Sequence, residues 1–351
     1  MKRIIHHSFL CIPLFFLLLL PACGRGRGGH VLEIAYVSGI QANLRDRVAA
    51  VYEKTGIVKN GDRVEVLDHD RHFVKVRTAT GATGWMEQRF LVSQEVYDRI
   101  QKLAADNQND PVQAQGTTRN DTNLHVEPGR DTEHLYQISA GEKLLVLKRG
   151  TAEKPGAVQT QSRSASRANS PGSAETEKKP SALIEDWWLV RDSHDRVGWV
   201  LARMVDFDVP LDVAQYAEGQ RIVAFFVLDQ VPDGDKKVAQ YLAVLTESKD
   251  GLPFDFNQIR VFTWNVKRHR YETAYRERME GVLPVKVSQE DFGKEGMLPT
   301  FTLRVLDEKG NVTERKYKLN TPIVRRVLAP GEEPVRSESK KTVSRKGKRR
   351  R

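Results

Sequence analysis

Few residues of this chain could do chemistry, and cysteine is the rarest of them. The 351-residue sequence has two cysteines, Cys11 and Cys23, and nine histidines. His69 and His72 flank a turn with acidic neighbours, but no further side chain is spaced to complete a zinc site. No glycine-rich phosphate loop, His-Glu-x-x-His or Gly-x-Ser-x-Gly motif is present. We therefore expect no catalytic residue, no metal, no cofactor and no enzymatic activity.

The N-terminal segment predicts export. A cationic start, Met1-Lys2-Arg3, precedes the mostly apolar run Phe9–Leu20, which is too short for a spanning helix and is typical of a secretory signal. Leu20-Pro21-Ala22-Cys23 resembles the bacterial lipobox. The resemblance implies a signal peptide of residues 1–22, acylation of Cys23 and stable membrane anchoring by two or more acyl chains. Gly24 favours the outer membrane by the same resemblance. The alternative is an ordinary signal peptide followed by an accidental cysteine.

Cleavage before Cys23 would remove Cys11, so the mature chain would keep one, acylated, cysteine. A disulfide framework is then excluded, although the compartment is oxidising. A cysteine peptidase and a thiolate zinc site are excluded for the same reason.

The positive charge of the chain sits at its end. The formal net charge is +10, but residues 336–351 hold nine Lys and Arg and a single acid. The body between Cys23 and residue 335 is therefore neutral, and residues 328–351 are expected to form a disordered basic tail. Attachment to an anionic surface is one expectation and a solvated tail without a partner is the other; no specific nucleic acid is expected. The surface-binding candidates are Lys340, Lys341, Arg345, Lys346, Lys348, Arg349, Arg350 and Arg351.

Two stretches of the chain, residues 32–92 and 116–207, repeat one pattern. The matched positions are Asn43-Leu44, Gly61, Gly84-Trp85 and Arg89 in the first copy and Asn123-Leu124, Gly141, Gly198-Trp199 and Arg203 in the second. Alternation such as Val64-Glu65-Val66, with glycine turns between the segments, predicts short strands. Shared spacing at so many positions indicates a duplication.

These motifs resemble the bacterial SH3-like (SH3b) family, which implies two small SH3-like β-barrels. The second copy departs from the pattern by His125 in place of arginine, and by 34 extra residues between Leu147 and Trp187. That insert, residues 148–180, lacks large apolar side chains and is expected to be disordered. Between the copies, residues 93–115 predict a short amphipathic helix and a loose linker; packing on a barrel is the first expectation, partner binding the second.

Aromatic side chains are the main binding candidates. The resemblance implies grooves for cell-wall peptides or protein segments, and extended peptides bind along aromatic walls in SH3 domains. The candidates are Tyr52, Phe73 and Trp85 in the first copy and Tyr136, Trp187, Trp188 and Trp199 in the second. The alternative places Trp85, Trp199 and one of Trp187 and Trp188 in the core. Strand alternation sends Trp187 and Trp188 to opposite faces, so we expect one of them to be exposed.

The C-terminal region, residues 211–327, predicts a separate antiparallel β domain of no recognised family. The expected strands are Arg221–Asp229, Val238–Thr246, Ile259–Asn265, Tyr271–Arg278, Val282–Val287, Thr300–Leu306 and Thr313–Leu319. Residues 264–272 look like a hairpin with a cationic tip, which is either a solvated turn or a site for an anionic ligand.

The fold class expected is therefore mainly β: two small SH3-like barrels followed by an antiparallel β domain. The first functional hypothesis is a non-catalytic envelope lipoprotein that binds peptidoglycan or envelope proteins as a scaffold or targeting unit, facing the periplasm or exterior. One alternative is a wall-targeted enzyme with catalysis in the C-terminal domain. The other is a structural assembly subunit whose SH3b grooves are filled by its own chain.

Overall fold

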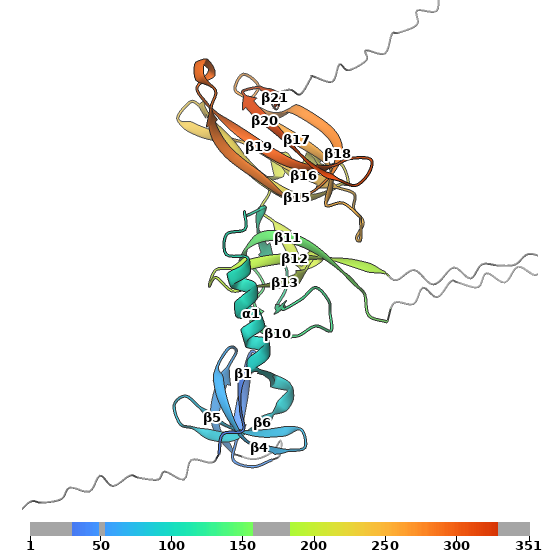
Figure 1. The fold of residues 1–351 in the computed structure, drawn as a ribbon. Coiled ribbons are helices and arrows are strands. Elements are labelled where there is room, and N and C mark those ends of the chain that lie inside the picture. Colours follow the sequence, from blue (N-terminus) through green and yellow to red (C-terminus); the bar gives the residue numbers. More distant parts are fainter. Residues whose placement is uncertain (1–29, 49–52, 157–182, 329–351) are drawn as a thin grey trace, which may run out of the picture.

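The computed structural model describes residues 30–48, 53–156 and 183–328. Within these ranges the chain forms three antiparallel sheets of seven strands each, stacked along one axis in chain order (Figure 1). The prediction of a mainly β fold is confirmed. The signal segment with Cys23, residues 157–182 of the insert and residues 329–351 of the basic tail lie outside the described ranges.

The first two domains repeat one topology. In the first sheet the strands lie in the order β3-β2-β6-β5-β4-β1-β7, and adding seven to each label gives the second, β10-β9-β13-β12-β11-β8-β14. The first domain contains β1 Glu33–Val37, β2 Gln41–Arg45, β3 Lys54–Lys59, β4 Arg63–Asp70, β5 Phe73–Thr78, β6 Thr83–Glu87, the 3-10 turn η1 Gln88–Phe90 and β7 Leu91–Ser93. The second contains β8 Ala114–Thr118, β9 Thr122–His125, β10 His134–Ile138, β11 Lys143–Glu153, β12 Ile184–Asp192, β13 Val197–Leu201, η2 Ala202–Met204 and β14 Val205–Phe207.

The barrels expected from the sequence do not close in the described residues. Each strand order is linear, with β3 and β7 at the edges of the first sheet and β10 and β14 at those of the second. The insert also begins later than expected. Strands β11 and β12 continue outward as paired arms, with Glu153 opposite Ile184, so residues 148–153 belong to the sheet.

The glycine of the repeated Gly-Trp motif has a steric cause. A Cβ on Gly84 would lie 2.8 Å from the Cβ of Leu44, and one on Gly198 would lie 2.6 Å from the Cβ of Leu124. Both leucines are fully buried on the second strand of their domain. Only glycine lets the strand with the leucine pack so closely against the strand with the Gly-Trp motif. The Asn-Leu and Gly-Trp motifs are therefore in direct contact.

One helix, α1 Gln94–Asp106, connects the first two domains. Its first turn is capped by Ser93, whose Oγ accepts a hydrogen bond from the Val96 backbone N–H at 3.4 Å. Val96 and Ile100 are buried in a cluster with Tyr36 of the first domain and Leu135 of the second. The helix therefore holds the two domains together. No helix in the described ranges is both long and apolar enough to cross a membrane.

The third domain is a meander in which β15 to β21 pair in chain order. Its elements are α2 Leu211–Ala214, η3 Gln215–Ala217, β15 Arg221–Asp233, β16 Lys236–Thr246, β17 Phe256–Asn265, β18 Arg270–Asp291, η4 Gly293–Glu295, β19 Met297–Leu306, β20 Val312–Asn320 and β21 Ile323–Val327. Two strands expected from the sequence form the single strand β18, and β21 was not predicted.

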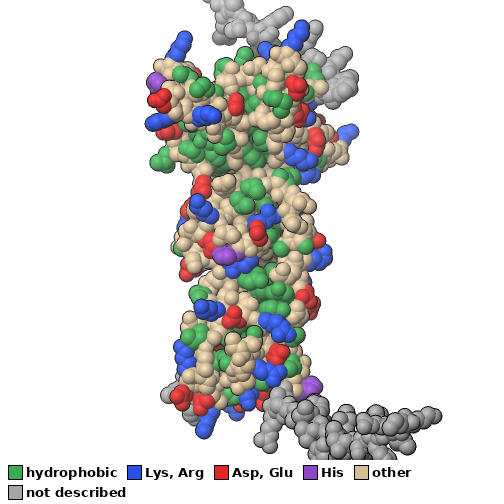
Figure 2. Space-filling view, turned by 90° about the vertical axis from the view of Figure 1, so that its left-hand side faces the viewer, with side chains coloured by type: hydrophobic (Ala, Val, Ile, Leu, Met, Phe, Trp, Pro, Cys, Tyr) green, Lys and Arg blue, Asp and Glu red, His purple; other side chains and the backbone are tan. Residues whose placement is uncertain are grey.

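The second and third domains share one core. A single cluster of buried side chains includes Leu124 and Trp188 of the second domain and Phe256 and Phe301 of the third. Burial of apolar surface across this boundary favours a fixed arrangement of the two domains. On the face shown in Figure 2, acidic and basic side chains are interspersed rather than gathered by sign, as the neutral body of the sequence predicts.

Candidate functional site at the junction of the second and third domains

The paired arms of β11 and β12 bring charged side chains to the third domain. Asp186 is fully buried, and its Oδ1 accepts hydrogen bonds from Arg149 at 2.6 Å and from the backbone N–H of Gly251 at 3.0 Å. Arg149 also bonds to Asp255 at 3.0 Å, and Arg221 donates to Asp186 Oδ2. Burial alone would raise the pKa of Asp186, but the hydrogen bond from Arg149 leads the effects that keep its pKa below the usual value. Asp186 is therefore ionised, and its contacts with Arg221 and Gly251 join the second domain to the third. We refer to this arrangement as the Asp186 joint.

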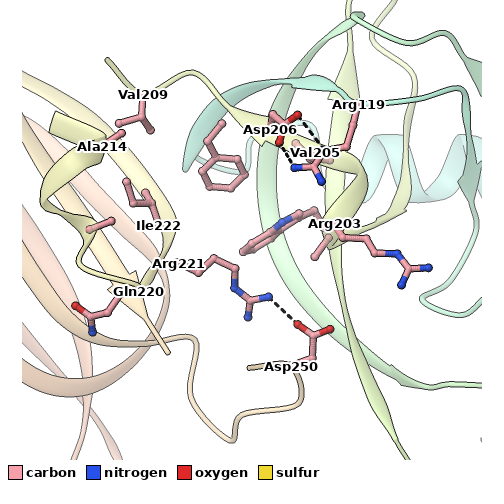
Figure 3. A pocket seen from close by; sticks show the side chains of 14 residues that line it. Arg119, Arg203, Val205, Asp206, Val209, Ala214, Gln220, Arg221, Ile222 and Asp250 are labelled. Atoms are coloured by element: carbon pink, nitrogen blue, oxygen red, sulfur yellow. Dashed lines mark hydrogen bonds and ion pairs between the residues drawn. The ribbon is translucent and has the colours of Figure 1, made fainter. Parts of the chain in front are cut away.

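Beside this joint lies a pocket of about 410 Å³. This volume is within the range of small-molecule sites in proteins. Side chains from both domains form its walls (Figure 3). The lining residues are Arg119, Trp188, Ala202, Arg203, Val205, Asp206 and Phe207 of the second domain, and Val209, Ala214, Ala217, Gln220, Arg221, Ile222 and Asp250 of the linker and third domain.

The floor of the pocket is apolar. Trp188 is buried and lies 5.6 Å from the half-buried ring of Phe207, measured between ring centroids. Ile222 and Val209 face them from the side of the third domain. Because these side chains present apolar surface to the pocket, the pocket favours a ligand that has an apolar group of its own.

Charged pairs form the rim. Figure 3 shows Arg119 turned toward Asp206 on one side and Arg221 turned toward Asp250, at 2.7 Å, on another. The hydrogen bond from Arg119 holds the pKa of Asp206 below its usual value. The third arginine, Arg203, is 3.9 Å from the nearest oxygen of Glu185. The rim thus offers both signs of charge around an apolar floor.

The aromatic residues predicted to line SH3b grooves do not gather in one place. Tyr52 lies outside the described residues. Phe73 and Trp85 are half-buried in the first domain, and Trp199 is half-buried in the second. Tyr136 lies at the boundary of the first two domains, where the Arg196 guanidinium is 4.9 Å from its ring centroid. Of the candidates, only Trp188 lines the junction pocket.

The expectation that one of Trp187 and Trp188 is exposed is wrong, since each is 2 % exposed. Alternation does send them to opposite faces, but both faces are covered. Trp187 packs edge-on against His125, with ring centroids 5.3 Å apart, and Trp188 packs on Phe207. Both covering rings belong to the second domain, and Trp188 also lies in the core shared with the third domain.

Two clusters of titratable groups lie elsewhere in the structure. Glu142, Asp192 and His194 have ligand atoms within 4.8 Å of one another. Asp192 accepts a hydrogen bond of 2.6 Å from Arg196 Nε, so we interpret this cluster as one that stabilises a turn. In the third domain, Asp233 Oδ2 accepts from Trp264 Nε1 at 2.9 Å and lies 2.8 Å from His269 Nδ1. The hydrogen bond with His269 leads the effects that lower the pKa of Asp233.

The Asp233–His269 pair gives the predicted cationic hairpin a definite geometry. His269 has a positive φ of 48°, which is uncommon for a residue other than glycine. Because Asp233 is a carboxylate, Nδ1 of His269 carries the proton that Asp233 accepts, so the tautomer with this hydrogen bond presents Nε2 as its proton acceptor. The His269 side chain is 69 % exposed, so the ring is accessible.

Comparison with known families identifies one part of the chain. Residues 40–92 match the family described as bacterial SH3 domain, and the first domain is therefore a bacterial SH3 domain. No curated protein matches the chain.

Similar solved structures come from NlpC/P60 proteins. NlpC2 from Trichomonas vaginalis is 9% identical, with 84% of this chain and 95% of that chain covered and a TM-score of 0.16. NlpC1 from the same organism is 8% identical, with 86% and 92% covered and a TM-score of 0.17. An NlpC/P60 family protein from Bacillus cereus ATCC 10987 is 12% identical, with 82% and 95% covered and a TM-score of 0.22.

These comparisons correct the first functional hypothesis. The hypothesis of a non-catalytic scaffold is contradicted, since the similar solved structures are NlpC/P60 proteins. We therefore do not keep the scaffold hypothesis. At these TM-scores the likeness carries no argument about the reaction or the residues of this chain, and the described residues include no cysteine.

Sequence reasoning missed the junction pocket because its walls come from positions between Arg119 and Asp250. One signal was available: Asp186 stands directly before two tryptophans in a strand pattern, and a carboxylate that is buried needs a cationic partner. Nothing in the sequence indicates that its partners would be Arg149 and Arg221.

Proposed function

We propose that the chain is exported, anchored in the cell envelope through an acylated Cys23, and that the junction pocket is where it takes a small ligand from the wall. The lipobox-like segment supports the anchoring, and the bacterial SH3 domain of residues 40–92 supports a role at the wall. We also infer that the second domain is a second SH3b copy. Its strand order and its Gly198 contact, which repeat those of the first domain, support this.

The observation that carries the proposal is the composition of the pocket. It joins an apolar floor of Trp188 and Phe207 to a rim with both signs of charge, in a volume of about 410 Å³. Such a site suits a small amphipathic ligand, since a few polar groups fix its orientation and the floor removes its apolar surface from water. Trp188 is the residue that this site shares with the aromatic side chains predicted to line SH3b grooves.

The proposal is tested by calorimetry with peptidoglycan fragments released from sacculi by a muramidase and then by an amidase, which frees the amino ends of the peptides. Arg203→Gln should weaken their binding. Arg89→Gln is the matched control, because Arg89 follows the Gly-Trp motif at the same position in the first domain and is likewise exposed. Equal binding by both variants, or no binding by the unaltered protein, would contradict the proposal.

A second candidate function, hydrolysis in the third domain, is favoured by the Asp233–His269 pair. A carboxylate that orients a histidine and leaves Nε2 free is the arrangement of a general base. Mass spectrometry of the same fragments after incubation would reveal cleavage. His269→Gln should abolish any turnover, whereas His194→Gln, which alters an equally exposed histidine, should leave it unchanged. Turnover that survives His269→Gln would place catalysis elsewhere.

A further inference from the structure

The charged groups on the pocket rim differ in how many of their hydrogen-bond donors and acceptors already have a partner within the protein. Arg119 and Asp206 form a two-bond pair. Arg221 is held by Asp186, by Asp250 and by the Lys249 carbonyl. These three side chains therefore have little to offer a ligand.

Arg203 is different. Its closest carboxylate oxygen, on Glu185, is 3.9 Å away, which is beyond hydrogen-bonding distance. Glu185 already accepts two hydrogen bonds of 2.7 Å from Arg130. The Arg203 guanidinium, 60 % exposed, thus keeps its donors for an incoming anion, and a planar guanidinium matches a carboxylate in particular.

Asp250 is the corresponding acceptor. Its Oδ1 accepts from Arg221 at 2.7 Å, and among the described residues its Oδ2 has no hydrogen-bond partner. The side chain is 43 % exposed at the pocket edge. It can therefore accept a hydrogen bond from an ammonium group while keeping its own ion pair.

The two available groups belong to different domains. Arg203 lies in the turn η2 of the second domain, and Asp250 lies in the turn that leads from β16 to β17 in the third (Figure 3). The buried Asp186 joint, through Arg149 and Gly251, fixes that turn against the second domain. The backbone segments that carry the two groups are thus held against each other before a ligand arrives, which lowers the entropic cost of binding.

We propose that the ligand of this pocket is a short peptide with both ends free. Its terminal carboxylate binds Arg203, its terminal ammonium binds Asp250, and an apolar side chain packs on Phe207 and Ile222. This inference rests on the proposed function and adds the chemical class of its ligand. A neutral saccharide would use neither the charge of Arg203 nor that of Asp250, so the rim favours a ligand that carries both charges.

The test is calorimetry of the full-length chain with the dipeptide alanyl-leucine, its N-acetyl form and its C-terminal amide. N-acetylation should weaken binding to the unaltered protein about tenfold, and amidation by a similar factor, because each removes one charge-assisted hydrogen bond. In Asp250→Asn, N-acetylation should have no further effect. In Arg203→Gln, amidation should have none.

Two matched variants serve as controls. Asp235→Asn and Arg89→Gln alter exposed charges outside the pocket and should bind all three dipeptides as the unaltered protein does. Equal affinity for free and blocked dipeptides, or discrimination that persists in Asp250→Asn and Arg203→Gln, would overturn the inference. If wall fragments bind through Arg203 while free and blocked dipeptides bind alike, the inference fails and the proposed function stands. If neither fragments nor dipeptides bind, both fail.

Discussion

At the scale of single residues, Asp186 has the strongest influence on the junction. Its side chain is fully buried, and the Arg149 side chain that it binds is 5 % exposed. Replacing the carboxylate leaves a buried cation with incomplete pairing, and breaking a buried ion pair costs about 3–5 kcal/mol. Asp186→Asn should lower the free energy of unfolding by about 3 kcal/mol, since Arg149 keeps Asp255.

Urea denaturation followed by tryptophan fluorescence would measure this loss. Asp206→Asn is the control, because that carboxylate also pairs with an arginine but is 52 % exposed. Exposed pairs contribute about 1 kcal/mol or less. A similar loss of unfolding free energy in both variants would show that Asp186 contributes no more to stability than an exposed ion pair does.

Also at this scale, the neighbouring rings of His125 and His134 predict a dependence on pH. Burial lowers the pKa of His125, with a further contribution from His134, and burial lowers the pKa of His134. The folded state thus binds protons less readily than the unfolded state, whose histidines titrate near pH 6.5. The contribution of these two histidines to the free energy of unfolding is therefore fully present above pH 6.5. It decreases as the pH falls from 6.5 toward the pKa values of the folded state.

The melting temperature should accordingly decrease between pH 7.5 and pH 5, a range above that in which the carboxylates with lowered pKa values titrate. The double variant His125→Gln/His134→Gln should show a shallower decrease. A decrease of the same size in the double variant would mean that other groups cause it.

At the scale of elements, helix α1 is expected to stabilise the first two domains together. Ile100 is 2 % exposed and shares a buried cluster with Tyr36 and Leu135, one from each domain. Removing a buried isoleucine side chain costs about 2–5 kcal/mol. Ile100→Ala should therefore lower the unfolding free energy by that amount. Lys102→Ala, on the exposed side of the helix, should change it by at most about 0.5 kcal/mol.

The elements also show which features the sequence could predict. Period-2 alternation located most strands, and the spacing of Val96 and Ile100 located α1, because these patterns follow from burial on one face. Strand β18 was predicted as two strands, Tyr271–Arg278 and Val282–Val287, with Gly281 between them. In the structure this glycine lies within the strand, where a Cβ would be 2.2 Å from Phe256. Strand β21 was missed because Arg325 and Arg326 interrupt the alternation.

The pocket, in contrast, could not be predicted. Alternation indicates which face of a strand is buried but not what covers it, so it did not show that His125 packs on Trp187 and Phe207 packs on Trp188. The repeated motifs singled out Arg203 in the second copy, but Asp250 comes to the same pocket through a turn of another domain. Such proximity depends on tertiary structure, which no local pattern of one sequence contains.

At the scale of the whole molecule, the ends of β11 and β12 connect the second domain to the third. The ends of β11 and β12 pair Gly150 with Trp187 and Thr151 with Asp186. This hairpin extension thus supplies the strand that carries the junction carboxylate. Residues 150–153 at the end of β11 should therefore matter more for stability than residues 157–182.

Two deletions test this difference. Replacing residues 157–182 by a short glycine-serine linker should change the unfolding free energy by about 1 kcal/mol or less, because loop closure entropy depends only weakly on length. Deleting residues 150–179 removes the end of β11 as well, so Asp186 loses its strand neighbour Thr151. The second deletion should expose the junction, lower the melting temperature clearly and abolish ligand binding in the pocket. Limited proteolysis between the second and third domains would show the loosened joint, and equal behaviour of the two deletions would mean that the arms do not hold the domains together.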